Sequence, residues 1–122
     1  MSLETIKIYY DDDNTSLRCQ YDYDAKNGKK VGFYQGWYRN GQLKLKRSYE
    51  NGLHQSYYEN GQLRTEYPVK NGKMGGLVQY WYPDGQKKEE YVFTNGRRHG
   101  PGRFWFKSGR LSTFNFVDGI RQ

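Results

Sequence analysis

The chain has 122 residues and one cysteine, Cys19, which excludes an intrachain disulfide framework and a thiol metal cluster. Its 22 aromatic residues outnumber the 16 leucine, isoleucine and valine residues, and such a composition is not typical of a disordered chain. Aromatic rings must therefore supply much of the buried area. No apolar run approaches the roughly 18 residues of a membrane helix, and no signal peptide is visible. We expect a cytoplasmic protein with one domain or one array.

The formal net charge is +7, and it is unevenly distributed. Residues 1–24 contain six acidic and two basic residues, whereas the rest contains 18 basic and seven acidic residues. A basic body suits an acidic partner, whether a protein, a nucleic acid or an anionic membrane surface. The alternative is a solvated surface that only resists aggregation.

Residues 1–26 form a degenerate N-terminal strand unit. Ile6, Ile8 and Tyr10 recur with the period of two that predicts a β-strand. Asp11 to Thr15 is a polar turn, and residues 17–23 are expected to return as a second strand.

Residues 27–122 read as one continuous array of repeats. Four segments share a pattern in which an aromatic pair is followed by two turn glycines: Trp37–Gly52, Tyr57–Gly72, Trp81–Gly96 and the shorter Trp105–Gly119. A full unit has 24 residues, and the third unit is clipped to 20. A fixed period of this size indicates a repeat architecture. The structural turn residues are Gly28, Gly41, Gly52, Gly61, Gly72, Gly85, Gly96 and Gly109.

Asn-Gly and Asp-Gly dipeptides between these runs predict hairpin turns in which both central residues have positive φ. The turn spacing leaves strands of six to eight residues, a usual length, and glycine recurs too often for helices. The sequence therefore predicts an all-β fold. We expect an antiparallel β-meander of successive hairpins, elongated into a single-sheet, solenoid-like array.

Strand alternation assigns side chains to faces. The three tryptophans share one face with Phe33 and Leu77, and the second aromatic of each pair occupies the other. In the return strands, one wet face is expected to carry Lys44, Lys46, Arg64 and Lys88. In the last repeat the alternate face becomes apolar through Phe114 and Phe116, as a cap or contact site would, while Val117 aligns with Tyr49, Val69 and Phe93.

The clipped third unit is a second departure from the pattern. Pro68 lies in its return strand, where a residue without an N–H needs a bulge or an unpaired position. We therefore interpret this unit as the place where the array bends or is gripped.

Two full units are GKKVGFYQGWYRNGQLKLKRSYENG and GRRHGPGRFWFKSGRLSTFNFVDG, and they resemble the bacterial variant of the MORN repeat. The resemblance covers residues 27–119. Proteins built only from such units are similar to the YwqK-family antitoxins of toxin–antitoxin systems, which implies a toxin-binding role. Eukaryotic MORN proteins imply phospholipid or protein scaffolding roles. The family pattern contains no catalytic motif.

The residues themselves suggest no catalytic, cofactor-binding or metal-binding group. His54 and His99 stand beside turn glycines, and the aspartates at 11–13 lack the spacing of a calcium loop. The candidate partner-binding residues are therefore surface residues: Trp37, Tyr57, Trp81, Trp105, Lys44, Lys46, Arg64 and Lys88. The tryptophan column is either core or a ladder of exposed rings.

We expect a non-enzymatic protein–protein interaction module without a cofactor, an antitoxin-like toxin binder being the specific version. The alternative is binding of anionic phospholipid or nucleic acid through the basic repeat surface. A meander also leaves two unpaired edge strands, through which copies of the chain can associate as a homo-oligomer.

Overall fold

The computed structural model describes residues 2–122, and all its regular structure is β-strand. The described residues form no helix, and hence none that could cross a membrane. The strands are β1 Leu3–Tyr9, β2 Leu17–Asp24, β3 Lys30–Trp37, β4 Leu43–Ser48, β5 Gly52–Tyr57, β6 Leu63–Lys70, β7 Lys73–Met74, β8 Gly76–Trp81, β9 Lys87–Thr94, β10 Arg97–Trp105, β11 Leu111–Val117 and β12 Ile120–Arg121.

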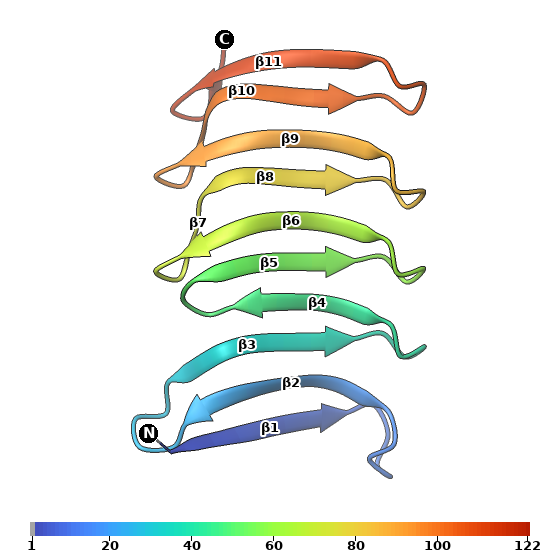
Figure 1. The fold of residues 1–122 in the computed structure, drawn as a ribbon, viewed down its shortest axis with the longest axis vertical. Helices are drawn as coiled ribbons and strands as arrows, with labels where there is room; N and C mark the ends of the chain where they lie inside the picture. The colour runs from blue at the N-terminus through green and yellow to red at the C-terminus, as the bar shows by residue number, and fades with distance from the viewer. Residues whose placement is uncertain (1) are drawn as a thin grey trace.

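All twelve strands belong to one antiparallel sheet, and they follow one another in chain order from β1 to β12, with the two-residue β7 beside β6 and off the main path. Figure 1 shows this sheet as a single layer of neighbouring strands, with β1 at one end and β11 at the other. The turns that follow the aromatic pairs all lie along one long edge (Figure 1). The predicted meander of hairpins is confirmed.

The two long edges carry different turns. All eight predicted turn glycines have positive φ, from 71° to 142°. At the edge with Asn71–Gly72, both residues of that turn have positive φ, 52° and 76°, as expected for an Asn-Gly hairpin, and so do Asn95 and Gly96. At the same edge only the glycine of Asn27–Gly28 and of Asn51–Gly52 has positive φ, so the prediction was wrong at these two turns. At the aromatic-pair edge the prediction was wrong, because only the glycine of Asn40–Gly41 has positive φ.

This second turn is one residue longer than the predicted one. The Gly41 N–H donates to the Tyr38 carbonyl at 3.0 Å, and the Tyr38 N–H donates to the Gln42 carbonyl at 2.9 Å. The Asn40 side-chain oxygen accepts a hydrogen bond from the Gln42 N–H at 2.9 Å. This bond stabilises the turn without a positive φ at Asn40.

The five main hairpins, whose turns lie at the aromatic-pair edge, are β1–β2, β3–β4, β5–β6, β8–β9 and β10–β11. Four of them contain a β-bulge directly after the turn. In β3–β4, Gly36 lies opposite Leu45 but Trp37 lies opposite Leu43, so Lys44 is an extra residue. The equivalent extra residues of the other three are Arg18, Arg64 and Lys88. The β10–β11 hairpin keeps an unshifted register, which explains why the last repeat segment is one residue shorter.

The sheet has two unlike faces. One, here called the tyrosine face, contains a row of side chains that includes Tyr21, Tyr34, Tyr67 and Tyr91. The other, the tryptophan face, contains the three tryptophans together with Phe33 and Leu77. The buried apolar side chains all lie on the tyrosine face: Cys19, Val69, Val78, Tyr91 and Phe116.

The predicted face of Phe114 and Phe116 was wrong. Phe114 lies opposite Gly102, which in turn lies opposite Tyr91, so Phe114 continues the tyrosine row. Phe116 is buried and meets the Tyr91 ring edge-on at a centroid distance of 5.7 Å. Because the last hairpin has no bulge, its alternation is shifted by one residue relative to the others. Phe116, and not Val117, therefore occupies the column of Val69.

A glycine makes this packing possible. A Cβ at Gly102 would lie 2.8 Å from the Tyr91 ring and 3.1 Å from the Phe116 ring. The space that a side chain would occupy is therefore filled by the two rings.

Tyrosine hydroxyls connect each hairpin to the next. The second aromatic of each pair donates its hydroxyl to the carbonyl of the first aromatic of the following hairpin: Tyr10 to Trp37 at 2.7 Å, Tyr38 to Tyr57 at 2.6 Å, Tyr58 to Trp81 at 2.7 Å and Tyr82 to Trp105 at 2.7 Å. In the last pair this position is Phe106, which has no hydroxyl to donate. We call this series the hydroxyl ladder.

The hydroxyl ladder passes through the clipped unit without interruption. The missing arm is replaced by a tight β4–β5 turn, in which the Ser48 hydroxyl donates to the Asn51 carbonyl at 2.6 Å. Pro68 lies where the pairing of β6 passes from β8 to β7, between the pairs made by Glu66 and Val69. Its missing N–H therefore falls at a gap in the ladder between β6 and β8, as predicted.

Replacing Tyr58 with phenylalanine removes one rung of the hydroxyl ladder and leaves the Trp81 carbonyl without this donor. We expect the Tyr58→Phe variant to lose about 0.5–1.5 kcal/mol of unfolding free energy. Urea denaturation at pH 7 measures the loss. Tyr9→Phe is the matched control, because the Tyr9 hydroxyl makes no hydrogen bond within the described residues, and an equal loss in both variants would contradict the assignment.

Candidate binding surface

The predicted aromatic candidates form a column on the tryptophan face. Trp37, Tyr57, Trp81 and Trp105 are all half-buried, so the column is neither a closed core nor a set of fully exposed rings. Leu43 lies opposite Trp37 in the strand register, and Leu63 lies opposite Tyr57. The exposed apolar side chains Phe33, Leu53 and Leu77 precede Trp37, Tyr57 and Trp81 by four residues in the sequence.

A polar row runs across the middle of the tryptophan face. Its members lie opposite one another from strand to strand: Lys7, Gln20, Gln35, Lys46, Gln55, Glu66, Gln79, Glu90, Arg103 and Thr113. Gln20 donates to Gln35 at 3.2 Å, and Gln55 donates to Glu66 at 2.8 Å. These side chains therefore satisfy much of their hydrogen bonding among themselves.

Glu90 is the buried member of this polar row. Its carboxylate accepts from Arg103 at 2.7 Å and pairs with Lys87 at 2.7 Å, and its side chain is only 12% exposed. Burial acts to raise the pKa of Glu90, but the hydrogen bonds and charges of Lys87 and Arg103 outweigh it and lower that pKa. Lys87 also donates to Gln79. The cations at this end of the face are therefore already paired.

Bulge residues supply a regular series of cations on the tyrosine face. The charged group of each lies over the second ring of an aromatic pair. The distances from the Arg Cζ or Lys Nζ atom to the ring centroid are 6.0 Å for Arg18 over Tyr10, 5.7 Å for Lys44 over Tyr38, 5.6 Å for Arg64 over Tyr58 and 5.8 Å for Lys88 over Tyr82. In the hairpin without a bulge, Arg110 takes this place over Phe106 at 4.5 Å. We call these five residues the cation ladder.

The predicted grouping of Lys44 with Lys46 was wrong. The bulge places the Lys44 ammonium over Tyr38, whereas the Lys46 ammonium lies 4.4 Å from the Phe33 ring on the tryptophan face. Lys44, Arg64 and Lys88 therefore belong to the tyrosine face. Among the four basic candidates chosen from sequence, only Lys46 shares a face with the tryptophan column.

Six more cations lie over rings of the tyrosine face: Lys30, Arg39, Arg47, Arg98, Lys107 and Arg121. Together with the cation ladder this makes eleven. Of these eleven cations, only Arg39 forms an ion pair with a carboxylate of the described residues, Asp11 at 3.7 Å. The positive charge of the molecule therefore concentrates on one face, where rings rather than carboxylates hold the cations.

The clipped unit adds a polar cluster to the middle of the tyrosine face. His54 stacks on Tyr67 with ring centroids 4.4 Å apart. The Nδ1 atom of His54 and the hydroxyl of Tyr49 are buried without a hydrogen-bond partner in the described residues. Burial and, secondarily, the positive charge of Arg47 lower the pKa of His54, which keeps the imidazole neutral near pH 7.

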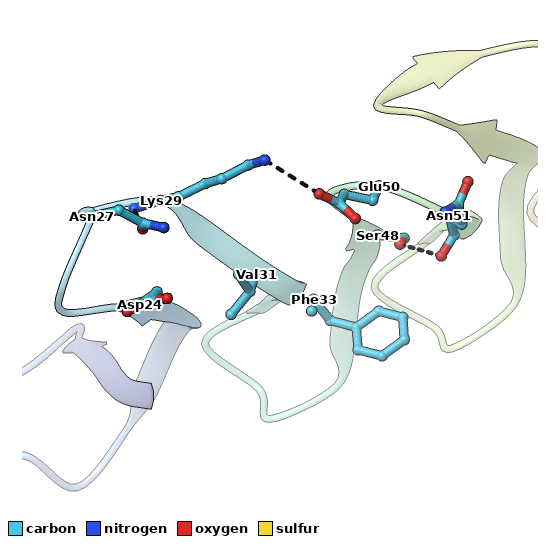
Figure 2. Close-up of a pocket in the computed structure, with 9 residues that line it drawn as sticks. Asp24, Asn27, Lys29, Val31, Phe33, Ser48, Glu50 and Asn51 are labelled. Carbon is cyan, nitrogen blue, oxygen red and sulfur yellow. Dashed lines mark hydrogen bonds and ion pairs between the residues drawn. The ribbon is translucent and has the colours of Figure 1, made fainter. Parts of the chain in front are cut away.

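A hollow of about 540 Å³ lies near the other long edge of the sheet, between the β2–β3 and β4–β5 turns. Figure 2 shows Lys29 reaching across it toward Glu50, with an ion pair of 3.4 Å, and Ser48 bonded to Asn51. Val31 and Phe33 form its apolar side (Figure 2). Lys29 and Glu50 thus neutralise each other, and the hollow brings together none of the predicted partner-binding residues.

Sequence reasoning missed the hydroxyl ladder and the cation ladder as units. The usable signal was present, because a basic residue follows the first residue of each bulged return strand at Arg18, Lys44, Arg64 and Lys88. What the sequence did not reveal is that these residues are inserted into the register and so change face.

Comparison with known families gives one match. A family model described as MORN repeat variant matches residues 30–51, 50–71 and 74–95, together just over half of the chain. These segments end before the β10–β11 hairpin, the one without a bulge. No curated protein matches the sequence.

Replacing Glu90 with glutamine removes the charge between Lys87 and Arg103. We expect Glu90→Gln to lower the unfolding free energy by about 1–3 kcal/mol at pH 7. Because the folded-state pKa of Glu90 is depressed, the difference persists above the unfolded pKa of about 4.3 and disappears as pH falls through the folded value. Urea denaturation from pH 7 to pH 3 measures this, with Glu59→Gln in an exposed turn as the control.

His54→Phe preserves the stack on Tyr67 and removes a buried nitrogen without a partner. We expect the variant to be at least as stable as the parent at pH 7, because the unpaired nitrogen costs about 1 kcal/mol. Below about pH 6.5 the unfolded parent binds a proton that the folded His54 resists, so only the parent loses stability there. Parallel stability curves from pH 8 to pH 5 would contradict this.

Proposed function

Because this chain belongs to the MORN repeat variant family, whose repeats are commonly protein- or membrane-binding modules, we propose that it is a non-enzymatic protein-binding module that uses its tyrosine face. The supporting observation is the cation ladder, which repeats in all five main hairpins. Four of these cations are placed by bulges, which commonly re-aim a side chain toward a functional surface.

The specific partner that we propose is an acidic protein, with a cognate toxin as the first candidate. An unpaired basic face accelerates encounter with an acidic partner and orients it, and it disfavours basic competitors. The half-buried tryptophan column is less suited to this role, because the polar row beside it has already paired many of its charges. On this reading, the chain inhibits its partner by covering an acidic surface.

A second candidate is anionic phospholipid or nucleic acid, and the same unpaired cations favour it. Such binding would depend mainly on phosphate contacts and would fall steeply with salt concentration. Equilibrium binding to vesicles and oligonucleotides between 50 and roughly 200 mM salt separates the two candidates, because a protein interface retains more of its affinity over that range.

The direct test is co-expression with the product of the adjacent gene. We expect the chain to co-purify with this partner and to relieve its toxicity. The triple variant Lys44→Gln, Arg64→Gln, Lys88→Gln should lower the affinity at least tenfold, because it removes three ladder cations. The matched control Lys26→Gln, Lys70→Gln, Lys73→Gln lowers the net charge equally at exposed positions outside the ladder, and should cost less than about threefold.

Two results would overturn the proposal in different ways. No co-purification and no rescue would remove the antitoxin version. Equal losses in the triple variant and its control would show that net charge, and not the tyrosine face, determines binding.

A further inference from the structure

The cation ladder has a regular spacing that restricts what can bind along it. Successive ladder residues are separated by two strands, and neighbouring strands lie about 4.8 Å apart, so the rungs are about 9.6 Å apart. Five rungs span roughly 40 Å across the sheet. The ladder is thus a line of positive charges running perpendicular to the strands. At the Tyr10 and Tyr82 rings, Arg39 and Lys107 add a second cation.

The rungs are accessible and chemically alike. Arg18, Lys44, Arg64 and Arg110 are exposed and Lys88 is half-buried. None of the five forms an ion pair with a carboxylate of the described residues. Each is held over a ring, which limits how far the charge can move and so maintains the spacing.

Nucleic acids match this line poorly. Duplex DNA carries one charge per roughly 1.7 Å of axis, several times denser than the rungs. A single strand needs rings on which its bases can stack. The rings under the ladder are already engaged, because each tyrosine hydroxyl is bonded to the next hairpin and a cation lies over the ring.

A polyproline II segment matches it well. This conformation has three residues per turn and rises about 3.1 Å per residue, so every third side chain points the same way at intervals of about 9.3 Å. That interval agrees with the rung spacing of about 9.6 Å. The backbone of such a segment needs no strand partner, so it can cross the strands of the sheet at right angles.

We propose that the cation ladder binds an acidic protein segment in the polyproline II conformation, with Asp or Glu at every third residue and one carboxylate per rung. This inference rests on the proposed protein-binding function and specifies the partner chemistry of the same surface. A segment of 13 residues reaches all five rungs. Because polyproline II is already extended in the free chain, little conformational entropy is lost on binding.

The test uses the intact chain and synthetic fluorescent peptides at low salt. The regular peptide contains five Glu-Pro-Pro triplets, and its control has the same composition with the five glutamates consecutive. Fluorescence anisotropy should show at least tenfold tighter binding of the regular peptide. Equal affinities for the two peptides, or no binding of the regular one, would overturn the proposal.

A length series tests the spacing without any substitution in the protein. Affinity should rise with each triplet from three to five, and a sixth triplet should add less than a factor of two, because no rung remains. A continued rise beyond five triplets would show nonspecific charge attraction instead.

The variants connect the peptide to the ladder. Lys44→Gln, Arg64→Gln, Lys88→Gln should lower the affinity for the regular peptide at least tenfold, whereas Lys26→Gln, Lys70→Gln, Lys73→Gln should lower it less than threefold. Equal losses would refute a role for the rungs. The single variant Arg64→Gln should lose less than the triple variant, and it provides the same test if the triple variant does not fold.

Two further probes separate this inference from the proposed function. Tighter, ladder-dependent binding of a 15-nucleotide oligothymidylate or of phosphatidylserine vesicles would replace the peptide with a phosphate ligand. If the triple variant loses the co-purified protein partner but the regular peptide has no advantage, the protein-binding function stands and the period-three segment is wrong.

Discussion

The structure depends on the hydrogen bond from a tyrosine hydroxyl to the carbonyl of the next hairpin. A single-layer sheet has no second layer to bury its rings, and only five apolar side chains of the described residues are buried. Tyr10, Tyr38, Tyr58 and Tyr82 make this bond at 2.6–2.7 Å, always one hairpin ahead. Each rung fixes one hairpin to its neighbour, and stability accumulates along the array by nearest-neighbour contacts.

The bulge residues and the hydroxyl ladder meet at the same tyrosine rings. At each bulged hairpin the ring whose hydroxyl crosses to the next unit is covered by the inserted basic side chain, as Lys44 covers Tyr38. The ring is thus held at its edge by a carbonyl and on one face by a cation. One inserted residue therefore stabilises the ring and also positions a charge at a fixed interval. The terminal hairpin has neither the bulge nor the hydroxyl, and it reaches a similar arrangement with Arg110 over Phe106.

The two faces differ in how their charges are compensated. On the tryptophan face, the polar row pairs amides with carboxylates and encloses Glu90 between Lys87 and Arg103. On the tyrosine face, eleven cations lie over rings, and within the described residues one has a carboxylate partner. Cation–π contacts hold a cation without neutralising it. The tyrosine face therefore keeps its net positive charge available to a partner, and this asymmetry underlies the function that we propose.

The sequence by itself determined the repeat period, the hairpin meander and the turn glycines, because these depend on local turn chemistry and on alternation along one strand. Only the tertiary structure decided the faces of Lys44 and Phe114 and the partners of Tyr38 and Tyr58. A bulge is a property of two paired strands, and one inserted residue reverses every later side chain. The pattern within a single strand cannot show which residue is inserted. The hydroxyl ladder likewise joins residues about 20 positions apart, whose meeting depends on how hairpins stack.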